Sequence, residues 1–330
     1  MKKILLIYTG GTIGMIQKNN SLSPFDFDNL KNAIPEIKDC GSDVQHISLE
    51  NPIDSSNMNI KYWRELSSCI YNHYDRYDGF VILHGSDTMA YTASMLSFMF
   101  ENVNKAIILT GSQLPIGIKR SDAKENLITS IEIASSEIVK EICVYFEYQL
   151  FRGNRVVKVN AENFDAFKSP NYPILAQAGV KIKYQKQYLN TINNKKLKLF
   201  SQISNDVAIL KIFPSINKNY VKSALNSSKG IILESFGSGN ATTEKWFLDA
   251  LKSAINNGQI IINISQCLSG SVSQGNYQTS ILLKKIGVIS GNDMTTEAAL
   301  TKLMHLLGQN FSDAKVKQKI TSNLRGEITI

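Results

Sequence analysis

The segment Tyr8-Thr9-Gly10-Gly11-Thr12-Ile13-Gly14 follows the apolar run Ile4-Leu5-Leu6-Ile7, and His84-Gly85-Ser86-Asp87-Thr88 follows Phe80-Val81-Ile82-Leu83. Each pair predicts a buried strand that ends in a turn with glycine and hydroxyl side chains. Ligands of open α/β sheets bind outside the carboxyl ends of the strands, so the two turns can face one pocket. This layout is typical of an enzyme that acts on a small molecule.

Alternating strand and helix patterns extend this architecture along the first half of the chain. Helical patterns cover 60–73, 87–100 and 121–138. Apolar, strand-like runs lie at 3–8, 43–49, 79–84, 105–110 and 142–148. The alternation predicts βαβ units and a mainly parallel sheet.

A second α/β region begins near Asp206. Its strand patterns lie at 207–213, 229–234 and 259–264, and its helical patterns lie at 243–257 and 293–308. A polar stretch rich in lysine and asparagine precedes it. We therefore expect an α/β protein with a larger N-terminal domain over 1–184, a linker over 185–205 and a smaller C-terminal domain over 206–330.

Length and composition limit the class of protein. The chain has 330 residues, of which 43% are hydrophobic and 19% are charged, so it can build a large core and is not a disordered protein. No apolar stretch reaches the roughly 18 to 20 residues that a membrane span needs. The run from Ile4 to Tyr8 is too short for a signal peptide. The sequence thus predicts a cytoplasmic protein that does not associate with membranes.

The spacing of cysteines and histidines and the distribution of charge predict neither a metal site nor a nucleic-acid partner. The four cysteines contain no CxxC pair, and the four histidines show no ligand spacing, so we expect no disulfide, no metal and no cofactor. The net charge of +8 comes mostly from scattered lysines without a recognised nucleic-acid-binding module. We therefore expect no nucleic-acid partner.

Polar residues near the predicted strand ends have ordinary structural interpretations when each is taken alone. Thr12 fits a turn residue better than a nucleophile, Asp87 fits a helix cap, and a lysine in a strand-like segment, such as Lys158, usually points to water. Ser55 and Ser56 also fit the cap of a following helix. Four strand-end loops that together carry small hydroxyl residues and one acid nevertheless predict a site for a small polar substrate.

These motifs carry a resemblance to a known family. The segments 8–14 and 77–93 resemble the two threonine motifs of bacterial L-asparaginases, and the chain is most similar to the cytoplasmic type I branch. Further matches are Thr110-Gly111-Ser112-Gln113, Arg152-Gly153-Asn154-Arg155 with Lys158, and segments 164–167, 237–240, 266–270 and 293–303. The matches run from residue 5 to Gly326 in the same order and cover both predicted domains.

The resemblance implies two α/β domains, of which the larger has a flavodoxin-like sheet. It implies that a homodimer, or a dimer of dimers, hydrolyses L-asparagine to L-aspartate and ammonia. The residues at the family's catalytic positions are the nucleophile Thr12 and the relay Ser86, Asp87 and Lys158. Those at its substrate-binding positions are Gly11, Asp54, Ser55, Ser56, Gly85, Ser112 and Asn240, of which Asn240 reaches the partner subunit's site.

A mechanism without a metal can be written for these residues. A threonine hydroxyl is a poor nucleophile at neutral pH and needs a base or a polarising network. A lysine shielded from water favours its neutral form, so we expect Lys158 to accept a proton relayed by Ser86 and oriented by Asp87. Backbone N–H groups near Thr12 and Ser86 would stabilise the developing oxyanion. A covalent acyl-enzyme and direct attack by water both stay open.

Four residues depart from the family pattern. Ser86 stands where threonine is usual and lacks the methyl group that restricts χ1, which predicts retained activity with a less fixed hydroxyl. Leu22 stands in a segment where a tyrosine often orients the nucleophile. Glu234 replaces an expected arginine and Val157 replaces a hydroxyl residue, so we hypothesise weak or absent activation by a second asparagine.

Three alternatives accompany this interpretation. One extra methylene is worth only about 1 to 3 kcal/mol, which leaves room for minor glutaminase activity, although Ser56 favours asparagine. An amidotransferase subunit of the same superfamily is a second alternative, but Met1 leads straight into the first strand, whereas those chains usually carry an additional N-terminal module. A catalytically silent amino-acid sensor is a third, supported by Ser86 and Leu22 and opposed by the intact set of Thr12, Asp87 and Lys158.

Overall fold

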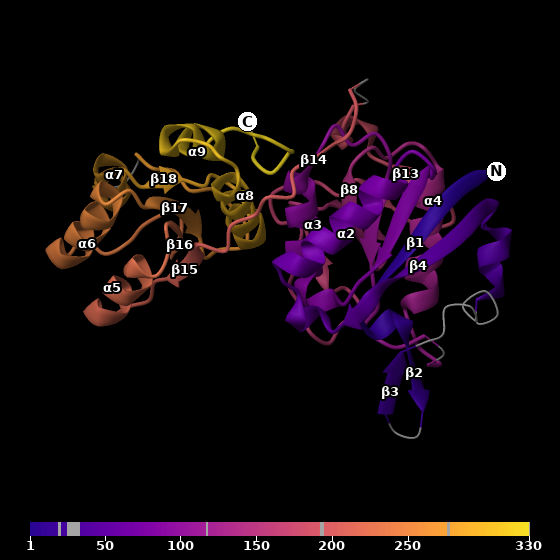
Figure 1. Ribbon diagram of the computed structural model, residues 1–330. Helices are drawn as coiled ribbons and strands as arrows, with labels where there is room; N and C mark the ends of the chain where they lie inside the picture. Colours follow the sequence, from indigo (N-terminus) through magenta and orange to yellow (C-terminus); the bar gives the residue numbers. More distant parts are fainter. Residues whose placement is uncertain (19–20, 25–33, 117, 192–194, 276–277, 330) are drawn as a thin grey trace. The chain divides into compact units, whose positions relative to one another are not determined.

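The computed structural model describes residues 1–18, 21–24, 34–116, 118–191, 195–275 and 278–329, which form two compact units (Figure 1). The first unit comprises Met1–Ser169 and Pro173–Ser201, and the second comprises Pro170–Tyr172 and Gln202–Ile330. The first contains a large, mostly parallel sheet and the second contains a smaller, separate parallel sheet. The fold class predicted from the sequence is therefore confirmed.

An eight-stranded sheet in the order β13-β12-β9-β8-β7-β5-β1-β4 forms the centre of the first unit. Its strands are β1 (Lys2–Gly10), β4 (Ser42–Ile53), β5 (Gly79–Leu83), β7 (Ile107–Thr110), β8 (Ile142–Phe146), β9 (Gln149–Arg152), β12 (Ala176–Gln177) and β13 (Lys183–Tyr184). Strands β4, β1, β5, β7 and β8 pair in parallel, and the remaining three extend one edge through antiparallel pairs. The parallel part has the flavodoxin-like order, in which ligands bind where β1 meets β5.

Burial explains why the apolar runs form the central strands. Every residue of Ile4–Ile7 and of Phe80–Leu83 is at most 1% exposed, as expected for parallel strands that are covered on both faces. The helices of this unit are α2 (Ile60–His73), α3 (Met89–Met99) and α4 (Ala123–Ser135). Helix α3 packs against β7 and β8, and α4 packs against β1, β5 and β7.

Short elements complete the first unit. They are the 3₁₀ turns η1 (Thr12–Gly14), η3 (Pro35–Cys40), η4 (Ser55–Asn57), η5 (Ser86–Thr88) and η6 (Lys186–Tyr188), and the strands β2 (Met15–Lys18), β3 (Ser21–Pro24), β6 (Phe100–Glu101), β10 (Val157–Lys158), β11 (Phe167–Lys168) and β14 (Lys198–Leu199). The segment 185–205, expected as a connector, thus carries η6 and β14, and β14 pairs with β6. The strand expected around Lys158 has only two residues, which pair with β11.

The helix-cap interpretation that Asp87, Ser55 and Ser56 allowed when each was taken alone is wrong. Asp87 lies inside η5, and neither the N-cap of η5, Gly85, nor that of α3, Thr88, makes a side-chain cap. Ser55 and Ser56 do not cap α2, because Asn59 accepts the hydrogen bond from the N–H of Lys61. The polar side chains of the strand-end turns are therefore not used to cap the helices that follow.

The second unit is built on a four-stranded parallel sheet in the order β15-β16-β17-β18. Ile231 and Leu233 pack into one hydrophobic cluster and Ile232 into the other, since alternate residues of a strand face opposite sides. The strands are β15 (Val207–Lys211), β16 (Gly230–Ser235), β17 (Ile260–Ser265) and β18 (Ile289–Ser290), and the helices are α5 (Lys218–Asn226), α6 (Lys245–Asn256), α7 (Gln278–Ile286), α8 (Thr296–Gly308) and α9 (Asp313–Ile320). Among the described residues, no helix is long and apolar enough to cross a bilayer.

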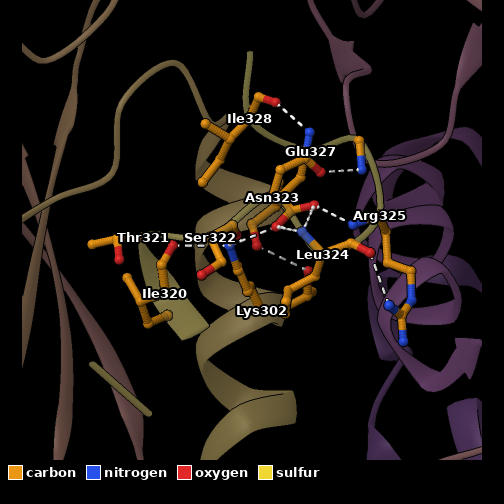
Figure 2. A network of polar contacts seen from close by, with 12 residues as sticks. Lys302, Ile320, Thr321, Ser322, Asn323, Leu324, Arg325, Glu327 and Ile328 are labelled. Atoms are coloured by element: carbon orange, nitrogen blue, oxygen red, sulfur yellow. Dashed lines mark hydrogen bonds and ion pairs between the residues drawn. The ribbon is translucent and has the colours of Figure 1, made fainter. Parts of the chain in front are cut away.

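A buried ion pair fastens the C-terminal segment to α8, as Figure 2 shows. Lys302 Nζ lies 2.5 Å from Glu327 Oε1, and both side chains are 0% exposed. The ammonium group also donates to the carbonyl oxygens of Ile320 and Ser322, while the carboxylate accepts from the N–H groups of Leu324 and Arg325. Burial lowers the pKa of Lys302. The hydrogen bonds of both charged groups are thus made to the backbone of the C-terminal segment, and they form only when that segment is folded against α8.

Removing one partner of this pair should be costly. We expect Glu327→Gln to lower the free energy of unfolding by about 3 to 5 kcal/mol, because it leaves a buried ammonium without its counter-charge. Urea unfolding of the whole protein measures this change. The control is Asp249→Asn, which breaks the exposed Lys245–Asp249 pair and should change stability little. Equal effects of the two substitutions would contradict the expectation.

Candidate functional site

Four turns at the carboxyl ends of neighbouring parallel strands carry most of the candidate residues. Thr12 lies in η1 directly after β1, and Ser86 and Asp87 lie in η5 after β5. Residues 54–57 follow β4, and residues 111–114 follow β7. Because these strands run parallel side by side, the four turns lie at one edge of the sheet, at the position where flavodoxin-like folds bind ligands.

Glycines allow the turns to approach closely. Gly11 has φ +87°, and a Cβ atom there would lie 2.5 Å from the backbone nitrogen of Gly85. A Cβ atom on Gly85 would lie 2.5 Å from Ser55 Oγ, and one on Gly111 would meet the carbonyl oxygen of His84. A larger residue at Gly11 or Gly111 would push the turns apart, since contacts this short with backbone atoms cannot relax cheaply, and one at Gly85 would displace the Ser55 side chain. The glycines therefore bring the Thr12, Ser55 and Ser86 turns together.

Lys158 is the centre of a polar cluster with two residues of η5. Its Nζ donates to Ser86 Oγ at 2.8 Å and to Asp87 Oδ1 at 2.6 Å. The Lys158 side chain is 17% exposed, whereas that of Asp87 is 66% exposed. The Lys158 side chain therefore does not point to water. The short β10–β11 hairpin places the sheltered ammonium group of Lys158 against the exposed carboxylate of Asp87.

Thr12 is half-buried at the start of η1. Its hydroxyl makes no hydrogen bond to any residue in the part of the chain that the structure describes. The turn around it is closed by the buried Tyr8, whose hydroxyl donates to the carbonyl oxygen of Gly14 at 3.2 Å. The threonine oxygen is thus held by a fixed turn and stays free of hydrogen bonds to the described residues. The side chain of Leu22 lies outside the described residues.

The turn after β4 is fixed by its own carboxylate. Asp54 Oδ1 accepts from the N–H of Ser56 at 2.8 Å and from its hydroxyl at 2.7 Å, and these bonds lower the pKa of Asp54. Ser55 is buried against Gly85, and its carbonyl oxygen accepts from the hydroxyl of Thr88 at 2.7 Å. This last bond ties the turn to η5.

Two of the expected binding residues make other contacts. Ser112 is buried, and its hydroxyl donates to the carbonyl oxygen of Leu114 within its own turn at 2.6 Å. Asn240 belongs to the second unit, where its Oδ1 accepts from the hydroxyl of Thr279 at 2.5 Å. The structure therefore joins Ser86, Asp87 and Lys158 through direct contacts. Ser55 is linked to them through Thr88 and Gly85, and the turn of Thr12 is linked through the contact of Gly11 with Gly85.

His84 and Gln113 contribute in ways that the sequence did not indicate. The carbonyl oxygen of Gly85 accepts from His84 Nδ1 at 2.7 Å, so the other ring nitrogen, Nε2, must accept from the hydroxyl of Thr92 at 2.9 Å. Thr92 in turn accepts from the indole of Trp63 at 3.0 Å. This buried chain fixes the start of η5 from behind. Gln113 bridges Ser86 to the loop after Lys158. Its sequence signals were its position after a buried strand and its place in the motif 110–113, neither of which indicated these partners.

Neither metal ligands nor disulfides are present in the described residues. No group of three or more His, Cys, Asp or Glu side chains is arranged to hold a metal ion among them. All four cysteines are free thiols.

Comparison with known proteins gives the family. Residues 3–190 match the model "Asparaginase, N-terminal", and residues 206–320 match the model "Glutaminase/Asparaginase C-terminal domain". The chain belongs to the asparaginase family, which is the family that the sequence motifs indicated.

Three relatives illustrate the similarity. L-asparaginase 1 of Escherichia coli K12 is 40% identical over 332 residues, covering 99% of this chain and 98% of the relative. The 60 kDa lysophospholipase of Mus musculus is 38% identical and covers 100% of this chain and 63% of its own length. The crystal structure of L-asparaginase I from Vibrio cholerae matches with a TM-score of 0.93 and 39% identity, covering 100% of this chain and 99% of that one.

The buried imidazole of His84 makes stability depend on pH. Burial lowers the pKa of His84 from 6.5 to about 4. Between these values the unfolded chain binds a proton that the folded protein does not, so the free energy of unfolding falls as the pH drops from 6.5 towards 4. Over this pH range, protonation of His84 lowers the free energy of unfolding by about 3 kcal/mol in total.

A non-titrating variant isolates this effect. We expect the stability difference between the wild type and His84→Gln to shrink as the pH falls from 7 to 4, because only the wild type carries this protonation penalty. Urea unfolding at several pH values measures the difference. A difference that stays constant over this pH range would mean that His84 does not titrate as described.

Proposed function

We propose that this protein hydrolyses the side-chain amide of L-asparagine, which yields L-aspartate and ammonia. The observation that carries the proposal is the contact of Lys158 with Ser86 and Asp87 at the carboxyl end of β5, in a chain of the asparaginase family. Similarity to L-asparaginase 1 over nearly the whole of both chains supports the same reaction. The first unit carries all the proposed catalytic residues.

The exposure of the site residues supports a binding mode for the substrate. Asp87 is largely exposed and pairs with the α-ammonium group of asparagine, since a charge-assisted hydrogen bond suits these two groups. The Ser55–Ser56 turn, packed against Gly85, receives the α-carboxylate. The side-chain amide then lies towards the turn that holds Thr12.

Thr12 is the proposed nucleophile. Its oxygen attacks the amide carbon, and backbone N–H groups of the neighbouring turns stabilise the oxyanion, an effect worth about 3 to 4 kcal/mol per donor. The proton released by Thr12 passes through Ser86 to Lys158 and then to the departing ammonia. Water cleaves the resulting ester and frees aspartate.

Substrate binding prepares Lys158 for this role. Without substrate, its ammonium group donates to both Ser86 and Asp87. Once the α-ammonium group of asparagine occupies Asp87, two cations share one carboxylate, and Lys158 loses part of its ion pair. The sheltered position of Lys158 limits the access of water to its ammonium group.

The wider setting follows the family resemblance. We propose a cytoplasmic homo-oligomer, a dimer or a dimer of dimers, in which Asn240 reaches the partner subunit's site. Ser56 favours asparagine over glutamine as the substrate. We also propose minor glutaminase activity, because the one additional methylene group of glutamine changes binding by only about 1 to 3 kcal/mol.

Ammonia release tests the reaction and the nucleophile together. The purified protein should release ammonia from L-asparagine and much less from L-glutamine. Thr12→Ala should lower the rate by about a thousandfold or more, whereas the control Thr191→Ala, which changes an exposed threonine, should retain it. Asparagine binding without ammonia release would instead support an amino-acid sensor.

The residues at 157 and 234 support a simple dependence of rate on asparagine. Glu234 accepts from the hydroxyl of Thr296 at 2.7 Å and lies 3.5 Å from Lys211 Nζ, so a carboxylate occupies the place of a carboxylate-binding arginine. Val157 is buried and offers no hydroxyl. We expect hyperbolic saturation in initial-rate measurements, because an acid repels the carboxylate of a second asparagine. Strongly sigmoidal curves would defeat this expectation.

A further inference from the structure

Gln113, in the turn after β7, contacts two parts of the candidate site. Its Nε2 donates to the carbonyl oxygens of Ala161 at 3.3 Å and Asn163 at 3.0 Å, in the loop that follows Lys158. Its Oε1 accepts from Ser86 Oγ at 3.3 Å. Carbonyl oxygens can only accept, so the amide nitrogen must face the loop and the amide oxygen must face Ser86.

A buried carboxylate fixes the backbone of Gln113. The two carboxylate oxygens of Asp122, which is 8% exposed, accept from the Gln113 N–H at 3.1 and 3.0 Å. The same carboxylate accepts from the N–H of Leu114 at 3.2 Å and from Asn126 Nδ2 at 3.2 Å. Gln113 is therefore anchored at its backbone by Asp122 and at its amide by the two carbonyl groups, which leaves its oxygen in a defined place.

Ser86 needs such a restraint more than a threonine would. A serine hydroxyl can occupy three staggered χ1 positions, whereas the methyl group of threonine narrows that choice. Lys158 donates to the oxygen of Ser86, so it fixes where the oxygen accepts but not where the hydroxyl proton points. Gln113 accepts a hydrogen bond from the hydroxyl, so the two contacts together fix the position of Ser86 Oγ. Rotation about the Cβ–Oγ bond can still turn the hydroxyl towards Lys158 for the relay.

We propose that Gln113 is a positioning residue that holds the Ser86 hydroxyl in its working rotamer, in place of the restraint that a threonine methyl group would supply. The assignment rests on the proposed hydrolysis, in which Ser86 relays a proton. Gln113 acts through Ser86 and not on the substrate, so its loss should reduce turnover and leave substrate affinity nearly unchanged.

A double-mutant cycle tests this assignment, with kcat and KM for L-asparagine as readouts. We expect Gln113→Met to lower kcat about tenfold with little change in KM, as the loss of one hydrogen bond in the working arrangement predicts. In a Ser86→Thr background, the same substitution should lower kcat less than about threefold, since the methyl group already restrains the hydroxyl.

Asn160→Ala is the matched control for the loop after Lys158. Asn160 Oδ1 accepts from the N–H groups of Glu162 and Asn163, so this variant loosens the loop that Gln113 anchors without a contact to Ser86. We expect Asn160→Ala to keep kcat within about threefold of the wild type, because no hydrogen bond to the relay is lost.

The outcomes separate positioning from mere loop anchoring. Equal losses from Gln113→Met in the wild-type and Ser86→Thr backgrounds would overturn the proposal, and so would an equal loss in Asn160→Ala. If Ser86→Thr does not fold, the comparison of kcat between Gln113→Met and Asn160→Ala decides between the two roles by itself. A wild-type protein without ammonia release would overturn the proposed function as well, whereas an active wild type without coupling refutes only the role of Gln113.

Discussion

The close approach of two backbone segments, after β1 and after β5, is the constraint on which the rest of the site depends. Gly11 adopts a left-handed φ of +87° and leaves no room for a Cβ atom beside Gly85. Gly85 in turn packs against Ser55. Since Thr12, Ser86 and Asp87 stand next to these glycines in sequence, the backbone contact brings their turns together. The buried chain from His84 to Trp63 supports that arrangement from behind.

Unequal exposure gives the polar cluster its chemical character. Lys158 is sheltered and Asp87 is open, although their charged groups lie 2.6 Å apart. A carboxylate that faces solvent is accessible to a cationic substrate group, while a sheltered ammonium loses much of its compensation when that carboxylate is taken. In the proposed mechanism, the contact that stabilises the free site also makes the lysine responsive to substrate. A salt bridge with both partners exposed would not couple binding to proton transfer in this way.

Local pattern accounts for what could be predicted from the sequence. The central strands of both units contain apolar runs, such as Ile4–Ile7 in β1 and Phe80–Leu83 in β5. The two threonine motifs directly follow β1 and β5, so the fold class and the family were accessible. The helices α5, α7 and α9 were not predicted; in α5, for example, only Val221 and Leu225 are buried. The strand-end polar residues also looked like helix caps, a role that Asn59 fills for α2.

Long-range contacts account for what could not be predicted. Lys158 reaches η5 from a hairpin 72 residues away from Ser86 along the chain, and nothing in its own strand-like surroundings indicates that direction. Gln113 acquires its place from Asp122 and from a loop 48 to 50 residues further on. Such contacts arise only when the sheet brings distant turns to one edge, so a sequence pattern marks the residues without their partners.

The most direct test of the central claim is a crystal structure of the Thr12→Ala variant with L-asparagine bound. The account predicts the α-ammonium group on Asp87, the α-carboxylate at the Ser55–Ser56 turn and the side-chain amide carbon beside residue 12. Asparagine bound elsewhere, or bound here with its amide directed away from residue 12, would contradict it.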